Sequence, residues 1–216
     1  MATAMVNFAY ALGDREAGEA LLVDPAHAPV ELLELVEADG MRVVGALGTH
    51  FHFDHVGGEF AGQHVEGIVE LLAARDVPVH VQGAEVSWVR ERTGVAASAL
   101  VAHSPGDRLS VGELEVTLVH TPGHTPGSQC LLFEGRLVSG DTLFIEGCGR
   151  TDLAGSDPEE MYRTLSQRLV DVSDDTILYP GHFYAADASA PMSRVRAENW
   201  VLAPRTADEW LAMFAR

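Results

Sequence analysis

Hydrophobic residues in the first half of the chain recur at two spacings, which indicates strands and helices in alternation. Short apolar runs rich in Val, Leu and Ala predict strands at residues 19–25, 41–50 and 77–81. Apolar residues three and four positions apart predict helices at residues 28–40 and 65–77. The buried face of the first helix is expected to contain Leu32, Leu33, Leu35 and Val36.

The second half of the chain continues this alternation. Apolar residues at every second position from Leu114 to Leu118 predict a half-exposed strand. A helix is expected at residues 156–170, because Asp157 stands at a good N-cap position directly before Pro158. The remaining expected elements are two strands within residues 130–141, a strand at residues 174–182 and a helix at residues 206–214. Alternating strands and helices without a repeat predict an α/β layered domain.

The length and composition of the chain are those of a folded globular protein. With 216 residues, 47% hydrophobic and 21% charged, the chain is expected to form a single domain over residues 1–216, with a short C-terminal extension from about residue 185. No apolar stretch approaches the ~18 residues that span a bilayer, and the N-terminus lacks a signal-peptide pattern. We therefore expect a cytoplasmic protein without membrane contacts. Two cysteines are too few for a disulfide framework.

The charge of the chain excludes several functions. Its formal charge is −18, from 14 basic and 32 acidic residues, and every basic residue is an arginine. A P-loop lysine, a Schiff-base lysine and a lysine general base are therefore impossible. Such a negative field also repels phosphate backbones, and the arginines are scattered along the chain, so no nucleic-acid partner is expected.

Residues able to bind metal follow four of the predicted strands. His50, His52, Asp54 and His55 follow the second strand, within the sequence "THFHFDH". The other three, each directly after a later strand, are His124, Asp141 and His182. Strand ends along one edge of a sheet converge in space, and ligands of α/β folds gather there. We expect these residues to form one site.

The residue types indicate which ions this site would bind. Imidazole and carboxylate suit zinc, iron or manganese, whereas calcium sites use oxygen alone and structural zinc sites normally include cysteine. His50 and His52 can share one ion, while Asp54 and His55 reach a second. Seven ligands suit two ions bridged by a carboxylate, for which Asp141 is the natural choice. The other histidines, and Cys148 as a buried thiol, are interpreted as packed or solvated residues: His27, His64, His80, His103 and His120.

Four motifs in this order, "THFHFDH", "TPGH", "SGD" and "YPGH", resemble those of the metallo-β-lactamase fold superfamily, from about Asn7 to Tyr184. The resemblance implies a four-layer αββα sandwich. It also implies how the ligands divide: one ion held by His50, His52 and His124, the other by Asp54, His55 and His182, and Asp141 bridging. Family members usually have a strand before the segment that matches Asn7–Asp14, and only six residues precede it here, so this strand is expected to be missing or short.

Within the superfamily, the segment from Gly140 to Leu165 is similar to that of the glyoxalase II and persulfide dioxygenase branch. A glyoxalase II-like enzyme would hydrolyse a thioester derived from glutathione or another thiol. Two cations would lower the pKa of a bridging water, and the resulting hydroxide would attack the thioester carbonyl. Asp54 could orient the nucleophile or accept its proton. Arg150 could bind a substrate carboxylate, or could form a surface ion pair with Asp152 or Glu146.

Two other functions are compatible with the same residues. A persulfide dioxygenase would use a single Fe(II) held by His50, His124 and Asp141, with positions left open for persulfide and O₂. A non-catalytic metal-binding module is the third alternative. Cysteine stands in many true β-lactamases where this chain has Asp141, which disfavours antibiotic hydrolysis. The sequence leaves the physiological substrate and the oligomeric state undetermined.

Overall fold

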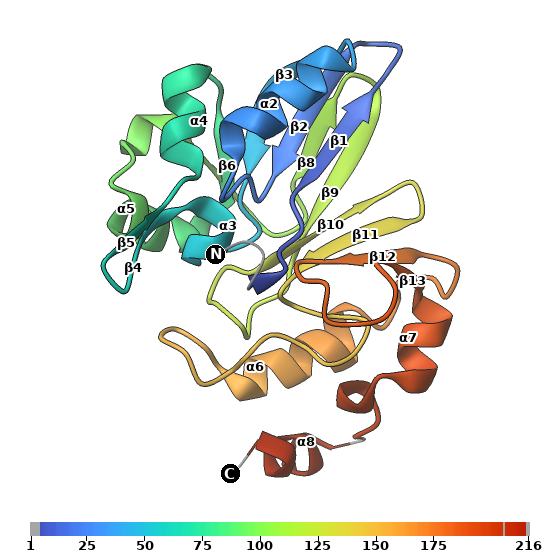
Figure 1. The fold of residues 1–216 in the computed structure, drawn as a ribbon. Coiled ribbons are helices and arrows are strands. Elements are labelled where there is room, and N and C mark those ends of the chain that lie inside the picture. Colours follow the sequence, from blue (N-terminus) through green and yellow to red (C-terminus); the bar gives the residue numbers. More distant parts are fainter. Residues whose placement is uncertain (1–4, 205, 215–216) are drawn as a thin grey trace.

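The computed structural model describes residues 5–204 and 206–214, and its core is two β-sheets stacked face to face (Figure 1). The first sheet has the order β1-β2-β3-β6-β7. Its strands β2, β3, β6 and β7 run parallel, while β1 pairs with β2 in the antiparallel direction. The bounds of its strands are β1 Tyr10–Asp14, β2 Glu19–Val23, β3 Arg42–Leu47, β6 Val79–Gln82 and β7 Leu100–His103.

The second sheet is largely antiparallel and has the order β13-β12-β11-β10-β9-β8. Only the pair β11 and β12 is parallel among its described strands. A separate short hairpin is formed by β4 Gly58–Phe60 and β5 Gln63–Val65. The bounds of the second sheet are β8 Arg108–Val111, β9 Leu114–His120, β10 Gln129–Phe133, β11 Arg136–Gly140, β12 Ile177–Pro180 and β13 Ala190–Pro191.

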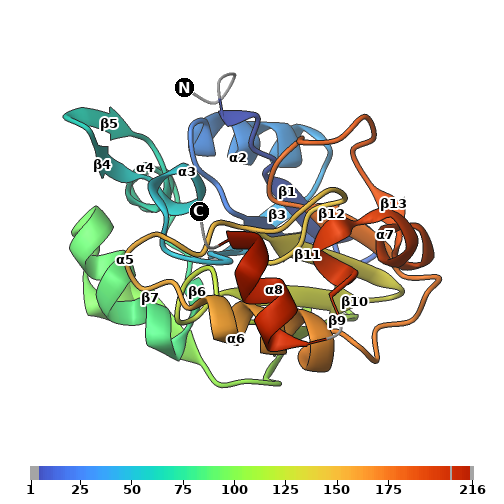
Figure 2. The same ribbon diagram turned by 90° about the horizontal axis from the view of Figure 1, so that it is seen from below.

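Helices cover the outer face of each sheet, which completes four layers (Figures 1 and 2). On the first sheet lie α2 Pro29–Ala38, α4 Ile68–Ala74 and α5 Val86–Thr93, and the short helix α3 Phe53–Val56 lies beside them. On the second sheet lie α6 Pro158–Arg163, α7 Met192–Glu198 and α8 Ala207–Phe214. Short helical turns complete the described elements: η1 Gly83–Glu85, η2 Ala97–Ala99, η3 Thr164–Arg168 and η4 Trp200–Leu202.

Three hydrophobic clusters hold these layers together. The central cluster joins the sheets, with Leu21 and Leu47 of the first packed against Leu118 and Leu131 of the second. One outer cluster packs α2, α4 and α5 on the first sheet, and the other packs α6, α7 and α8 on the second. Burial of apolar area between the layers is the main stabilising contribution in such folds. The expected α/β fold with αββα layers is confirmed.

The expected strands and helices are present, but several differ in their bounds: the helix expected at residues 156–170 is α6 Pro158–Arg163, continued by the turn η3 Thr164–Arg168. Leu35 was expected to be buried with its neighbours on α2, but it is 67% exposed; of the four leucine and valine residues expected on the buried face, only Leu33 and Val36 are buried. The second helix begins at Ile68 instead of Val65, since residues 63–65 pair in the hairpin. Asp157 caps α6 as expected, and its carboxylate accepts hydrogen bonds from two backbone amides.

The N-terminal edge of the first sheet is β1. Within the described part of the chain no strand precedes it, and Asn7 forms an isolated bridge with His182 instead. None of the helices in the described residues is long and apolar enough to cross a membrane.

Candidate metal centre

The seven candidate ligands follow four strands, as expected, but these strands belong to two sheets. His50 to His55 follow β3 of the first sheet, whereas His124, Asp141 and His182 follow β9, β11 and β12 of the second. The expectation that one sheet edge would gather them all was therefore wrong. The ligands still meet, because the two sheets are stacked with these strand ends at the same side of the sandwich.

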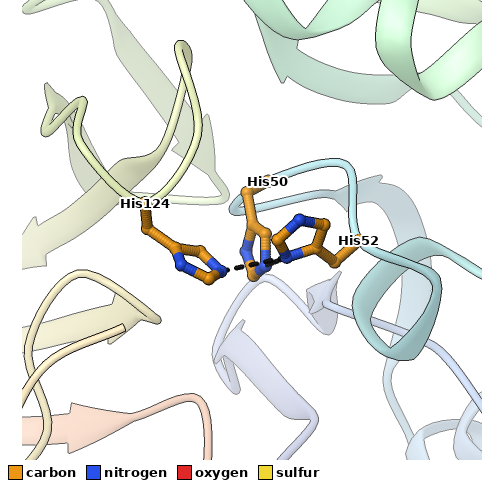
Figure 3. Close-up of side chains that lie close together, drawn as sticks. All are labelled: His50, His52 and His124. Atoms are coloured by element: carbon orange, nitrogen blue, oxygen red, sulfur yellow. Dashed lines mark hydrogen bonds between the residues drawn. The ribbon is translucent and has the colours of Figure 1, made fainter. Parts of the chain in front are cut away.

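Three histidines from both sheets form the first group of candidate ligands (Figure 3). Nδ1 of His52 lies 3.1 Å from Nε2 of His50 and 3.0 Å from Nε2 of His124. His50 and His52 leave the same short segment after β3, and His124 reaches them from the turn after β9. Nε2 of His50, Nδ1 of His52 and Nε2 of His124 thus point toward one another.

Hydrogen bonds on the far side of two of these rings assign their tautomers. Nδ1 of His124 lies 2.7 Å from the carbonyl oxygen of Arg150, to which it can only donate. Nδ1 of His50 lies 3.1 Å from the Thr49 hydroxyl, which itself donates to Asp24 and so accepts from His50. Both Nε2 atoms therefore lack a proton. His52 could donate to only one of them, so a cation between the three nitrogens fits this arrangement better than hydrogen bonds do.

The second group of candidate ligands is Asp54, His55 and His182. Oδ2 of Asp54 lies 3.7 Å from Nε2 of His55 and 3.5 Å from Nε2 of His182. Nδ1 of His182 donates to the carbonyl oxygen of Met5 at 2.8 Å, which leaves its Nε2 facing the site. Asp54 and His55 lie on α3, a single helical turn.

Asp141 lies between the two groups. Its Oδ2 is 3.5 Å from Nε2 of His124 and 3.3 Å from Nε2 of His182, while its Oδ1 is 3.4 Å from Nε2 of His55. Oδ1 of Asp141 and Nε2 of His55 are both buried and have no hydrogen-bond partner. Buried polar atoms without partners are rare in folded proteins. Their position and chemistry fit two cations that share the Asp141 carboxylate.

The charges in the site shift the pKa values of its ligands in opposite directions. Burial and the neighbouring His124 lower the pKa of His52 to about 3. Burial would also lower the pKa of His55, but the carboxylates of Asp141, Asp54 and Asp24 outweigh it and raise this pKa to about 10. Burial alone would raise the pKa of Asp141, but the imidazoles around it hold it well below its usual value. The carboxylates of Asp54 and Asp141, whose pKa values are both lowered, are therefore ionised near neutral pH and available to cations.

Tight turns bring the ligands this close. A Cβ atom on Gly181 would lie 2.4 Å from Oδ1 of Asp141, so a side chain here would displace the carboxylate. Gly149 is equally constrained, since a Cβ there would lie 2.1 Å from the Asp141 carbonyl oxygen and 2.8 Å from the His124 ring. These distances explain the glycines of "YPGH" and "GCGR".

The whole region from the first strand to the last ligand matches one protein family. The profile of the Metallo-beta-lactamase superfamily matches residues 3–182. The chain belongs to this superfamily. The superfamily assignment made from the four motifs is thus confirmed.

Relatives within the superfamily have different activities in their names. The hydroxyacylglutathione hydrolase of Polaromonas sp. is 34% identical over 182 residues, which cover 82% of this chain and 62% of that protein. The mitochondrial persulfide dioxygenase ETHE1 of Bos taurus is 30% identical over 185 residues, covering 82% of this chain and 64% of that protein. The chain thus spans less than two thirds of the length of these two relatives.

A solved structure of similar length has the same fold. The di-iron-bound form of TTHA1623 matches with a TM-score of 0.70 and 27% identity, over 88% of this chain and 92% of that one. Two irons in this superfamily member are consistent with a cluster of histidines and aspartates such as the one described above.

Three residues that support the site were not found from the sequence. Asp24 accepts hydrogen bonds from His55 and from the backbone and hydroxyl of Thr49. Asn7 donates to Oδ2 and to the carbonyl oxygen of Asp54. Asp24 also follows a strand, β2, in the sequence "VDP", and this position could have identified it. Asn7 has no such signal, because it reaches Asp54 across a separation of 47 residues.

The third supporting residue is Glu85, at the end of η1. Its Oε1 accepts hydrogen bonds from the Thr125 hydroxyl at 2.9 Å and the Gly127 amide at 2.6 Å, which fixes the turn that carries His124. Its Oε2 is buried without a hydrogen-bond partner in the described structure. Burial raises the pKa of Glu85 to about 7.

Residues outside the ligand groups have the following surroundings. Arg150 forms a bidentate ion pair with Asp152, at 2.9 and 2.8 Å, so the structure has the surface pair that was one of its two interpretations. Burial raises the pKa of Cys148 to about 12, which keeps the thiol protonated and argues against a nucleophile. Within the described residues, the five remaining histidines belong to neither group of candidate ligands: His27, His64, His80, His103 and His120.

Proposed function

We propose that this protein is a metal-dependent hydrolase of thioesters. The observation that carries the proposal is the position of Asp141 between two groups of three ligands, with Oδ1 of Asp141 and Nε2 of His55 buried and unpartnered. A carboxylate shared by two cations is the arrangement used to activate water for hydrolysis. A relative named hydroxyacylglutathione hydrolase, 34% identical over 82% of this chain, supports the choice of a thioester.

The ligands would divide as the family resemblance implies. His50, His52 and His124 would hold one ion, Asp54, His55 and His182 the other, and Asp141 would contact both. Zinc, iron and manganese all suit this donor set. When bound, the two cations lower the pKa of a coordinated water, so that it can act as a nucleophile near neutral pH.

The protein's own residues would prepare the reaction. Asp54, held by the amide of Asn7, faces the second ligand group and is placed to accept a hydrogen bond or a proton from the nucleophile. A pocket of about 590 Å³ opens in front of His52, Asp54 and His124, and would keep bulk water away from the reacting carbonyl. A thiolate leaves without a strong general acid, because the pKa of a free thiol is only about 8.5.

A persulfide dioxygenase is the second candidate. ETHE1 of Bos taurus, 30% identical over 82% of this chain, has this activity in its name. His124 and Asp141 lie 3.5 Å apart at their nearest polar atoms, and together with His50 they could hold one Fe(II) as two histidines and a carboxylate.

Elemental analysis of protein purified without added metal, with two assays on the same sample, separates these candidates. The first assay follows hydrolysis of S-lactoylglutathione and of S-acetyl-N-acetylcysteamine, a small neutral thioester. The second follows oxygen uptake with glutathione persulfide. We expect about two ions per chain, thioester hydrolysis and no oxygen uptake.

Other outcomes would change the proposal. One iron per chain with persulfide-dependent oxygen uptake would replace the hydrolase with the dioxygenase. Bound metal with neither activity would leave a metal-binding module.

A further inference from the structure

Six Phe, Tyr and Trp side chains from two parts of the chain line the pocket in front of the candidate ligands. We call Phe51, Phe53 and Phe60 the first aromatic group and Phe144, Tyr184 and Trp200 the second; all six line the pocket. The first comes from the segment around α3 and from β4, and the second from the segments after β11 and β12 and from η4.

Several of these rings are exposed although they are large and apolar. The exposed fractions are 47% for Phe60, 50% for Tyr184 and 51% for Trp200. Phe60 stacks on Phe53 with ring centroids 3.9 Å apart, and Tyr184 stacks on the ligand His182 at 4.7 Å. The rings are thus held in place by stacking while one face stays open to the pocket. Exposed apolar surface that continues into a site is typical of a place where a ligand is bound.

The charged groups beside the pocket are poorly suited to a glutathione ester, which carries two carboxylates. Apart from the ligands, the charged side chains that line it in the described structure are Arg92, Glu146 and Arg150. Arg150 is exposed and paired with Asp152, so a substrate carboxylate would have to replace Asp152 as its partner. Arg92 donates to the carbonyl oxygen of Glu59 and lies over the Phe51 ring, 5.9 Å from its centroid. The chain has no lysine, and its net charge of −18 disfavours anionic ligands in general.

We propose that this pocket selects thioesters with an uncharged, apolar acyl group, which would lie between the two aromatic groups, over hydroxyacyl esters of glutathione. This inference rests on the proposed thioester hydrolysis and names its substrate class. The reacting carbonyl would sit beside the candidate metal ligands, several of which line the pocket. The acyl group is the apolar part, because the thiols that carry acyl groups in cells contain polar amide bonds.

A series of thioesters with one thiol and different acyl groups tests the proposal. We would measure kcat/KM for the N-acetylcysteamine esters of acetyl, butyryl, hexanoyl and phenylacetyl groups, and for S-lactoylglutathione, on the metal-loaded protein. From acetyl to hexanoyl, kcat/KM should rise about fourfold per methylene, the factor that corresponds to about 0.8 kcal/mol for burying a CH₂ group. The hexanoyl and phenylacetyl esters should exceed S-lactoylglutathione by at least about tenfold.

Two variants connect this selectivity to the pocket. Phe60→Ala and Trp200→Ala each remove a ring that is about half exposed, so the fold should persist. Each should reduce kcat/KM for the hexanoyl ester about tenfold, with a clearly smaller loss for the acetyl ester. Leu35→Ala is the matched control, because Leu35 is 67% exposed on α2 and does not line the pocket. It should leave the whole series unchanged.

A binding measurement without chemistry separates the failure of this inference from the failure of the proposed function. The probe is the S-hexyl thioether of N-acetylcysteamine, which has no thioester carbonyl to hydrolyse, and its binding is measured by calorimetry at several temperatures. We expect the thioether to bind with a negative heat-capacity change. Its binding should be weaker in Trp200→Ala.

Hydrolysis with a flat acyl series, or with S-lactoylglutathione as the better substrate, would overturn the inference and leave the thioesterase intact. Binding of the thioether without hydrolysis of any thioester would overturn the proposed function and support an apolar occupant. If the protein neither hydrolyses any thioester nor binds the thioether, both the proposed function and this inference are overturned.

Discussion

Nδ1 of His55 lies 2.9 Å from Oδ2 of Asp24, and both side chains are buried. Donation of this hydrogen bond uses the proton on Nδ1, so that Nε2 would be the nitrogen that binds a cation of the second ligand group. The same carboxylate holds the backbone amide and hydroxyl of Thr49, which precedes the ligand His50. Asp24 therefore orients candidate ligands of both groups without belonging to either group.

Asp24→Asn should weaken metal binding about 10–100-fold, the usual effect of removing such a supporting hydrogen bond. An amide oxygen cannot replace both carboxylate oxygens, so either His55 or Thr49 loses its acceptor. Competition with a chelator, followed by elemental analysis, measures the loss. Asp39→Asn removes a carboxylate from an exposed ion pair with Arg15 and serves as the control. Equal affinities for the two variants would contradict this role of Asp24.

His124→Ala and Asp141→Ala should each abolish activity and remove metal while the fold persists. Both residues lie on loops after strands, outside the three hydrophobic clusters. Metal content per chain and circular dichroism check the two parts of this expectation. His64→Ala, at a histidine with a half-exposed side chain, should keep its metal. If metal content is unchanged in the first two variants, the ligand assignment is wrong.

Glu85→Gln should change how stability depends on pH. The pKa of Glu85 is raised to about 7 by burial, from 4.5 in the unfolded chain. As pH rises from 4.5 to 7, the unfolded chain ionises first, so the native protein loses up to about 3 kcal/mol through this group. The variant lacks this loss, and its stability relative to the native protein should improve between pH 4.5 and 7.

Urea unfolding of both proteins at pH 5 and pH 8 measures that difference. Glu91→Gln, at an exposed position of the neighbouring helix α5, controls for the removal of one negative charge. A stability difference between Glu85→Gln and the native protein that is the same at both pH values would disprove the buried, protonated Glu85.

Arg150→Ala should distinguish charged from neutral substrates. The guanidinium is exposed and paired with Asp152, and exposed pairs of this kind exchange partners at little cost. A substrate carboxylate can therefore recruit it. We expect KM to rise severalfold for S-succinyl-N-acetylcysteamine and to stay the same for the butyryl ester, with no change in metal content. Equal KM values before and after the substitution, for both esters, would restrict Arg150 to its ion pair.

Local signals in the sequence were sufficient to predict an α/β layered domain and the cluster of candidate ligands, whereas the four-layer arrangement was implied by the family resemblance. Alternating apolar runs, the Asp157 cap and ligands placed directly after strands are all visible within short segments. The supporting residues leave weaker signals. Asn7 and Glu85 reach the site from segments 47 and 40 residues away from the atoms they contact, and such distances depend on how the sheets stack.

The position of Leu35 shows a similar limit. Helical spacing placed Leu32, Leu33, Leu35 and Val36 on one broad face, but the sheet covers only part of it. Which side of an amphipathic helix is fully buried depends on the angle at which the helix crosses its sheet. The sharing of the ligands between two sheets was missed for the same reason, since the stacking of the layers has no local signature.

The origin of the ligands in both sheets bears on how the molecule assembles. Each group combines at least one residue of the first sheet with one from the second: His50 with His124, and His55 with His182. A cation bound by such a group could bind tightly only after the sheets have packed together. It would then link segments far apart in the sequence; His55 and His182 are more than a hundred residues apart. Metal uptake would therefore be a late event in folding, and chelation would loosen the seam between the sheets before either sheet unravels.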